Sequence, residues 1–510
     1  MRRLALTRSW LAPSAPAVAV IAALALLGPA LAWVIVKRPD LYRPLLTAAV
    51  VAILVILARR SPRTAIVTWL LLVPLLALTR RLLIAPSGWS SNDPLLLIGP
   101  LLAMYLIYRA YLVQKRPFTS DRVEKLALVL LGFGVVEAFN PTGGSGIVAG
   151  LGGLIFLGVP LLWFFLGRLY ATRRMVTILL VAAVPIAVAA ACYGLWQTHF
   201  RTTLPPWDLD WFNITGYQAL EVGSQTAAVQ IRPFATFSSN AEYSAYLSFG
   251  VVIALALAMH RRVVALAAIP VLLFALFYAG GRSVMVLTML SCVALFAIRR
   301  RRLGPGLAVF LAGLVVVYGA ALVFGSALDK AAQRTGDAIT ARSVGGLLNP
   351  LDPSQSTFLG HWNNLRGGVQ AGITSPLGKG TGAANIATDR LSGGKASGAI
   401  TDNDLADVFV SFGFVGGMVY LALIVILIGR ILGGYATRGD PLLLAIGGLL
   451  VANFEHWLNG GYYAVASLFW FVVGWASLPR PDPASSDPSS TPESTRAQRS
   501  AITGQANSLS

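Results

Sequence analysis

Arginine side chains at the ends of predicted helices are the residues of this sequence best suited to binding a phosphate-bearing group. Arg232 and Arg282 adjoin hydrophobic stretches, where a lipid headgroup would meet the protein. The guanidinium group is permanently charged, and its planar fork matches phosphate oxygens. Arg342 and Arg366 offer the same chemistry within a long polar segment. The alternative role for each arginine is a solvated loop charge or an ion pair with a nearby aspartate.

Asp402 is the acidic residue best placed to act as a general base. It directly precedes Asn403 at the entrance of a hydrophobic stretch, with Asp404 and Asp407 next along the chain. An aspartate with an ordinary pKa of about 4 is a weak base towards a hydroxyl group, but burial at the membrane edge would raise that pKa. Capping of the following helix by Thr401 or Asp402 is an equally weighted alternative.

Residues 357–373 are predicted to form an amphipathic helix at the membrane surface. Its apolar residues repeat at helical spacing, namely Phe358, Trp362, Leu365, Val369 and Ile373. His361 and Arg366 lie about 140° apart around such a helix, so they would border one cleft without chelating one small group. Packing of His361 at the interface is the favoured alternative to a catalytic role. The helix should end near Thr374, because Pro376 disfavours helical geometry at the residue before it.

The segment 376–382 reads Pro-Leu-Gly-Lys-Gly-Thr-Gly. Its glycines, including Gly380, allow a tight backbone path with accessible N–H groups, which is the composition of an anion-binding nest. The segment follows no predicted strand and lacks the Walker spacing, so a nucleotide-binding P-loop is excluded.

These residues are embedded in a strongly apolar chain. Hydrophobic residues make up 56% of the 510 residues and charged residues 12%, with a mean hydropathy of +0.70. We therefore predict an all-α polytopic membrane protein with about 12–14 transmembrane helices. The predicted spans are 17–36, 44–58, 64–79, 94–113, 124–139, 147–167, 175–196, 242–259, 263–280, 283–298, 306–325, 404–429, 441–457 and 462–478.

The net charge of +19 does not indicate nucleic-acid binding, because the basic residues concentrate in alternate connections between predicted helices. This positive-inside pattern predicts cytoplasmic termini in the cell inner membrane. Five basic residues fall on the wrong side of the pattern, namely Lys37, Arg38, Arg43, Arg80 and Arg81.

The predicted spans divide the chain into six parts. Transmembrane helices occupy 1–196, 242–325 and 404–478. Long loops, both predicted to be extracytoplasmic, cover 197–241 and 326–403, and a disordered cytoplasmic tail covers 479–510. Loops of this length are usually functional or disordered. The first is rich in aromatic residues, which indicates either an interfacial belt or a substrate surface.

Three segments in order resemble the O-antigen ligase and polymerase-like membrane proteins. They are Arg232 to Asn240, which runs into a helix, the turn Gly280 to Ser283, and the glycine-rich segment 376–382, followed later by Asn403 and Gly413-Phe-Val-Gly416. The resemblance covers roughly 230–425. One position departs from the ligase pattern, because Asp402 stands where that branch has its proposed catalytic histidine. His361 is a second candidate for that role.

The resemblance implies a metal-independent membrane glycosyltransferase without cofactors, acting on a polyprenyl-diphosphate-linked oligosaccharide and a glycan or lipid acceptor. Within such an activity we predict Asp402, Arg232 and Arg282 as catalytic residues, and a polymerase or a divergent relative is favoured over a ligase. The predicted substrate-binding residues are Arg366, His361, Arg342, Asn403 and Gly380. Membrane lipids and other polysaccharide-assembly proteins are further expected partners.

Two other classes of function remain open. A transporter would carry ionisable residues deep in the membrane, and Glu137 and Glu455 are the visible acids, the latter beside His456. A non-catalytic assembly protein is the other alternative. Cys192 and Cys292 both fall in predicted helices, so no disulfide framework or cysteine metal site is indicated.

Overall fold

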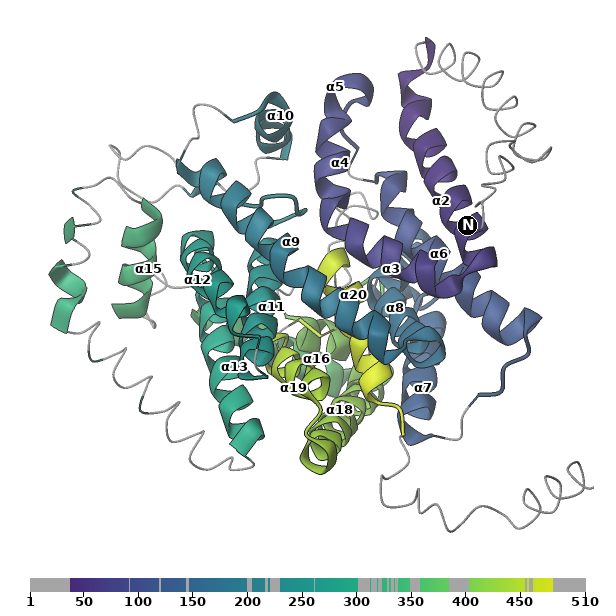
Figure 1. Ribbon diagram of the computed structural model, residues 1–510. Helices are drawn as coiled ribbons and strands as arrows, with labels where there is room; N and C mark the ends of the chain where they lie inside the picture. The colour runs from purple at the N-terminus through teal and green to yellow at the C-terminus, as the bar shows by residue number, and fades with distance from the viewer. Residues whose placement is uncertain are drawn as a thin grey trace, which may run out of the picture.

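The computed structural model describes residues 37–199, 204–215, 219–220, 230–260, 262–300, 358–384 and 403–479, with gaps at 91, 119–120, 144–145, 455 and 458–461, together with parts of 312–348. Figure 1 shows a bundle of helices. The N-terminal helices are η1 (Pro39–Leu41), α2 (Tyr42–Arg60), α3 (Pro62–Leu72), η2 (Val73–Leu75), α4 (Leu76–Leu82), α5 (Ile84–Ser87), η3 (Pro94–Leu97), α6 (Ile98–Tyr108), the π-helix η4 (Arg109–Val113), α7 (Arg122–Glu137), η5 (Pro141–Gly143), α8 (Gly146–Tyr170) and α9 (Arg173–His199).

The remaining elements begin within the first long loop. They are α10 (Pro206–Thr215), the strands β1 (Ala219–Leu220) and β2 (Gln230–Ile231), α11 (Asn240–Met259), η7 (Val263–Ala267), α12 (Ala268–Ala279), α13 (Arg282–Arg300), α15 (Ala338–Leu348), α16 (Phe358–Thr374), α18 (Asp404–Arg438), α19 (Pro441–Ala452) and α20 (Tyr463–Ala476). The two strands form one short antiparallel pair. Apart from this pair, the described chain is all-α, as predicted.

Several helices start with a recognisable sequence signal. Ser61, Asp93 and Asp440 each precede a proline at the start of a helix and accept a hydrogen bond from a backbone N–H of its first turn. A capping oxygen satisfies a donor that the helix itself leaves unpaired, and proline is tolerated in the first turn because it needs no hydrogen bond there. Local sequence therefore sets where these helices begin.

Eight helical segments within the described residues are long and apolar enough to cross a membrane. Three shorter apolar helices, 263–279, 441–452 and 463–476, accompany them. Helices occupy every predicted span except 17–36, which lies outside the described residues, and 306–325, which lies largely outside them. The prediction of a polytopic all-α membrane protein is confirmed.

Helix α11 is the centre of the bundle, because it packs against α9, α12, α13 and α19. Most of its residues are buried. Elsewhere, glycines permit close approach: a Cβ at Gly167 of α8 would collide with the carbonyl oxygen of Phe471 in α20, and one at Gly474 would meet Phe164. Such contacts between small residues are typical of helices packed in a membrane. Residues 232–239, which we call the Arg232 segment, lead directly into the buried helix α11.

Candidate functional site

The Arg232 segment lies against the turn between α12 and α13. The side-chain amide of Asn240, at the start of α11, donates hydrogen bonds to the carbonyl oxygens of Pro233 and Ala279, each at 2.9 Å. Gly280 follows Ala279 in the left-handed region, with φ of 69°. A Cβ placed at Gly280 would lie 3.7 Å from Nε of Arg232. Asn240 therefore ties the two segments together, and the turn leaves room for the arginine.

Arg282 and Arg342 join the same place. Arg282 begins α13, and its Nη1 donates to the backbone carbonyl of Arg342 in α15 at 3.4 Å. Ile339 of α15 reaches to 4.0 Å from a Cβ built at Gly280. Burial lowers the pKa of the Arg342 guanidinium from its ordinary value. The structure thus gathers three of the predicted arginines around one turn, and we call Arg232, Arg282 and Arg342 the arginine cluster.

Arg366 and His361 occupy a different element. Both are exposed on α16, which ends at Thr374 as predicted from Pro376. The helix packs on the first turns of α18 through glycines: a Cβ at Gly368 would lie 2.5 Å from Cβ of Ala406, and one at Gly372 would lie 2.8 Å from Phe409. The glycine face, not the apolar stripe, therefore meets the protein.

The apolar stripe of α16 stays largely uncovered. Trp362 is 55% exposed and Ile373 58% exposed, which leaves both side chains free to contact lipid, as the amphipathic pattern predicts. The placement of α16 at a membrane surface stays a prediction.

The glycine-rich segment does not form an open nest. Helix α18 contains a break at Gly413, whose φ of 67° and ψ of −168° are not helical. Lys379 N donates to the carbonyl of Val410 at 2.9 Å, and Gly380 N donates to that of Ser411 at 3.2 Å. Residues 375–384, which include this segment and which we call the wedge, therefore fill the break. Backbone N–H groups of the wedge are used in these hydrogen bonds. Gly380 is buried, and this geometry does not favour the prediction that it binds substrate.

Neighbouring backbone completes this wedge. Thr381 N donates to the carbonyl of Glu137 at 3.1 Å, and its hydroxyl donates to that of Gly150 at 2.6 Å. The Glu137 carboxylate accepts from Asn140 at 2.6 Å. The backbone carbonyl of Glu137 thus holds the wedge to α7, while its carboxylate, the group that a transporter interpretation would require, binds Asn140.

Asn403 is the N-cap of α18. Its side-chain oxygen accepts hydrogen bonds from the backbone N–H groups of Leu405 at 3.0 Å and Ala406 at 3.2 Å. The capping residue is therefore Asn403 and neither Thr401 nor Asp402, because the helix begins at Asp404. Asp404 is buried. Asp402 lies outside the described residues.

His456 lies in the turn between α19 and α20. Burial lowers the pKa of His456 to about 4, with a smaller contribution from His361. The ring of His456 lies 5.0 Å from that of Tyr462. Glu455, the acid next to it in the sequence, lies outside the described residues.

Among the described residues of the first long loop, Trp211 belongs to a small apolar core. Trp211 is 4% exposed and packs on Phe234 with ring centroids 4.6 Å apart. Ile84 and Leu204 belong to the same cluster. Neither the interfacial belt nor the substrate surface describes Trp211, because its burial stabilises the segment that follows Arg232.

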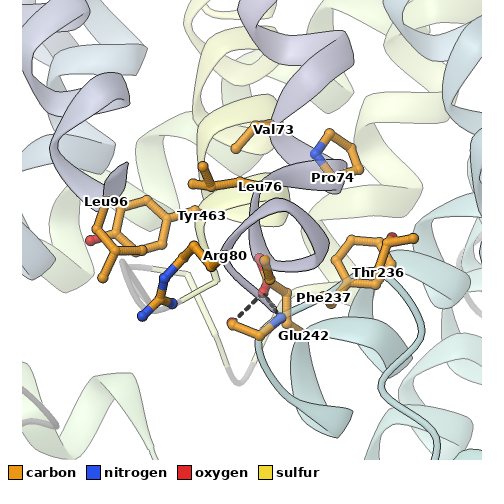
Figure 2. Close-up of a pocket in the computed structure, with 11 residues that line it drawn as sticks. Val73, Pro74, Leu76, Arg80, Leu96, Thr236, Phe237, Glu242 and Tyr463 are labelled. Atoms are coloured by element: carbon orange, nitrogen blue, oxygen red, sulfur yellow. Dashed lines mark hydrogen bonds between the residues drawn. The ribbon is translucent and has the colours of Figure 1, made fainter. Parts of the chain in front are cut away.

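Sequence reasoning missed the polar side chains that hold the Arg232 segment. Arg81 and Gln197 bind its backbone, and Glu242 accepts a hydrogen bond from Ser238 N at 3.1 Å and another from Ala464 N, at the start of α20, at 3.0 Å. Figure 2 shows Glu242 and Arg80 lining one small pocket. The one available signal was that Arg80 and Arg81 follow a predicted membrane helix on its non-cytoplasmic side, against the positive-inside pattern.

Among the residues that the structure describes, no group of three or more histidine, cysteine, aspartate or glutamate side chains is placed to hold a metal ion.

A comparison with protein families supports the resemblance. Residues 265–421 match the model of the O-antigen ligase family, Wzy_C. The match includes Gly280, Arg282, Arg342, the wedge and Gly413, whereas Arg232 precedes it. No curated protein and no solved structure matched the chain. The chain is therefore a polytopic membrane protein whose residues 265–421 are similar to the O-antigen ligase family, and this match supports a glycan-transferring function of the ligase or polymerase type.

Proposed function

We propose that the protein is a metal-independent membrane glycosyltransferase that uses polyprenyl-diphosphate-linked glycans outside the cytoplasmic membrane of the cell. The observation that carries the proposal is the arginine cluster, where Arg282 lies against Arg342 and Arg232 lies over Gly280. Guanidinium groups gathered in this way suit a ligand with several phosphate oxygens, because arginine forms strong, forked hydrogen bonds to them. A diphosphate joined to a lipid matches both the charge of the cluster and its place at the helix ends.

The proposed reaction is a displacement at the anomeric carbon of the donor. The acceptor hydroxyl oxygen forms the new bond to that carbon, and the bond from carbon to the diphosphate oxygen breaks with its electron pair leaving on the diphosphate. Arg232 and Arg282 stabilise this growing negative charge, which is usually the largest single catalytic contribution. The hydroxyl proton passes to a general base, which we assign to Asp402, next to the cap residue Asn403.

The acceptor distinguishes two versions of the function. Transfer to the end of another repeat unit would make the protein a polymerase, which the absence of a histidine at position 402 favours. The alternative is O-antigen ligase-type transfer to a lipid or protein acceptor, and the family match favours it. In both versions His361 and Arg366, exposed on α16, contact the acceptor or donor glycan.

A transporter is the less supported alternative. The break in α18 at Gly413 is the kind of discontinuous helix that transporters use for binding. Here the protein's own wedge occupies the break, through the hydrogen bonds of Lys379 and Gly380 to α18. The backbone groups that a solute would need are therefore used internally.

Deletion of the protein, followed by analysis of lipid-linked and surface glycans, tests the proposal. A polymerase deletion should accumulate single repeat units, and a ligase deletion should accumulate complete unattached chains. Complementation with Arg282→Ala should fail at normal protein level. Arg300→Ala, an exposed arginine in the last turn of the same helix, should complement and is the matched control. Normal surface glycan with R282A, together with altered solute uptake on deletion, would overturn the proposal.

A further inference from the structure

The segment between Arg232 and α11 is held in a strained conformation. Ala235 has φ of 46°, in the left-handed region that residues with a Cβ rarely adopt. Its side chain is fully buried. Such strain persists only where surrounding contacts impose it. The contacts that impose it therefore identify a backbone conformation that the fold specifically stabilises.

Arg81, in α4, supplies two of these contacts. Its Nη1 donates to the carbonyl oxygen of Phe237 at 2.7 Å, and its Nη2 donates to that of Ala235. Its Nε forms an ion pair with Asp208 of α10 at 2.9 Å, and the two side chains are 1% and 0% exposed. The planar fork of arginine thus clamps the strained residue from the carbonyl side, while Asp208 balances its charge.

Gln197, near the end of α9, holds the same residues from the amide side. Its side-chain oxygen accepts from Phe234 N at 3.1 Å and from Ala235 N at 2.7 Å. Its side-chain NH₂ donates to Asp208 at 2.8 Å. Asp208 therefore orients both Arg81 and Gln197, and the three side chains come from three separate elements.

We propose that Arg81, Gln197 and Asp208 form a cradle that positions Arg232 for the diphosphate donor. The inference rests on the proposed function, since Arg232 matters for transfer only if the arginine cluster binds that donor. All three cradle residues lie outside residues 265–421, the part matched by the family. The N-terminal helices thus complete the site, and Arg81 is a positioning residue that acts through Arg232.

Arg43 provides an internal control for this interpretation. It is also a buried arginine from the N-terminal helices, paired with Asp93, with side chains 5% and 0% exposed. Its other bonds go to Ser87, Gly88 and the backbone of Arg80. None of these bonds reaches the segment 232–239. A Lys replacement at either position keeps the charge and removes the fork, but only the one at Arg81 releases the carbonyl of Ala235.

Hydrogen exchange tests the cradle without reference to catalysis. In the full-length protein in lipid nanodiscs, Arg81→Lys should speed amide exchange in residues 234–237 about tenfold, whereas R43K should leave it within about twofold of the wild type. Ala235→Gly removes the strain at this position and should therefore slow the same exchange, so it serves as the test if R81K does not fold. Unchanged exchange in the R81K or A235G protein would overturn the cradle.

A double-mutant cycle tests whether the cradle acts through Arg232. R81K should lower turnover about tenfold per folded protein, and R81K combined with R232A should be no slower than R232A alone. Multiplying effects would show that Arg81 acts elsewhere and would overturn the positioning role. Normal turnover of R232A would instead remove Arg232 from the proposed function, while faster exchange in R81K would still establish the cradle as its structural support.

Discussion

Arginines gather at both ends of the helical bundle, but their neighbours differ. At the end where α7 begins and α8 and α20 end, Arg168 and Arg430 share Asp121, at 2.8 Å and 2.5 Å. At the opposite end, Arg282 lies against Arg342 around the turn after α12. Carboxylates close by make the first cluster a lock between helices. We propose that the second cluster, where two arginines adjoin, binds the diphosphate of the donor.

The largest expected effect is on turnover and follows a change in the arginine cluster. Arg282→Ala should lower the turnover of purified protein with a polyprenyl-diphosphate donor about 100- to 1000-fold, the usual loss when one charge-stabilising group is removed. Its thermal stability should change little, because R282A removes a positive charge from beside another. R300A should match the wild type in both measurements. Turnover of R282A within a few fold of wild type would place the site elsewhere.

The second prediction is that a change at the lock lowers stability and leaves turnover intact, the opposite of the effect of R282A. Asp121→Ala leaves Arg168 and Arg430 partly buried without this carboxylate, and breaking such a pair should cost about 3 kcal/mol of the free energy of unfolding. Denaturation in detergent measures this loss, and Asp40→Ala, in an exposed pair with Arg38, is the control. Turnover per folded molecule should be retained in D121A. A selective loss of turnover would mean that the lock takes part in the reaction.

Acid should weaken the lock through the same residue. Burial raises the pKa of Asp121, but the hydrogen bond from Arg430 and the charges of Arg168 and Arg430 outweigh it and hold the pKa below its ordinary value. The stabilising contribution is therefore complete above the unfolded pKa of about 3.9 and is lost as pH falls through the folded value. Stability of the wild type should fall below about pH 4.5, more steeply than that of Asp121→Asn. Parallel pH curves for the two proteins would contradict this assignment.

The smallest expected effect concerns Arg342. Arg342→Gln keeps the backbone carbonyl that accepts from Arg282 and removes one charge from the arginine cluster. The KM for the lipid-linked donor should rise about threefold to tenfold, with little change in kcat, if the side chain contributes to donor binding alone. Steady-state kinetics in nanodiscs measure this. A fall in kcat as large as that of R282A would make Arg342 an equal partner in catalysis.

Much of the fold could be predicted from the sequence because hydrophobic length and helix punctuation are local signals. Pro376 predicted the end of α16, and the apolar stretches predicted the membrane helices. The break at Gly413 could not be predicted, because the wedge that fills it comes from residues 375–384. Likewise, the glycine face of α16 is buried only because Ala406 and Phe409 lie opposite it.

The arginines of the candidate site could be predicted from the sequence, but the residues that hold them in place could not. Residue chemistry and the family resemblance selected Arg232, Arg282 and Arg342, and the structure brings these three together. Gly380 was selected for its flexible backbone, but its N–H group is bound to Ser411. Arg81 escaped selection because its role depends on contacts with residues more than 150 positions away in the chain. Its place against the charge pattern was the only local sign.

Donor binding tests the central claim most directly. Polyprenyl diphosphate, added to purified protein in nanodiscs, should raise the melting temperature of the wild type and of R300A. It should not do so for the R232A/R282A double variant, and polyprenyl monophosphate should stabilise the wild type less than the diphosphate does. Equal stabilisation of all three proteins by the diphosphate would contradict the assignment of the arginine cluster as the diphosphate site.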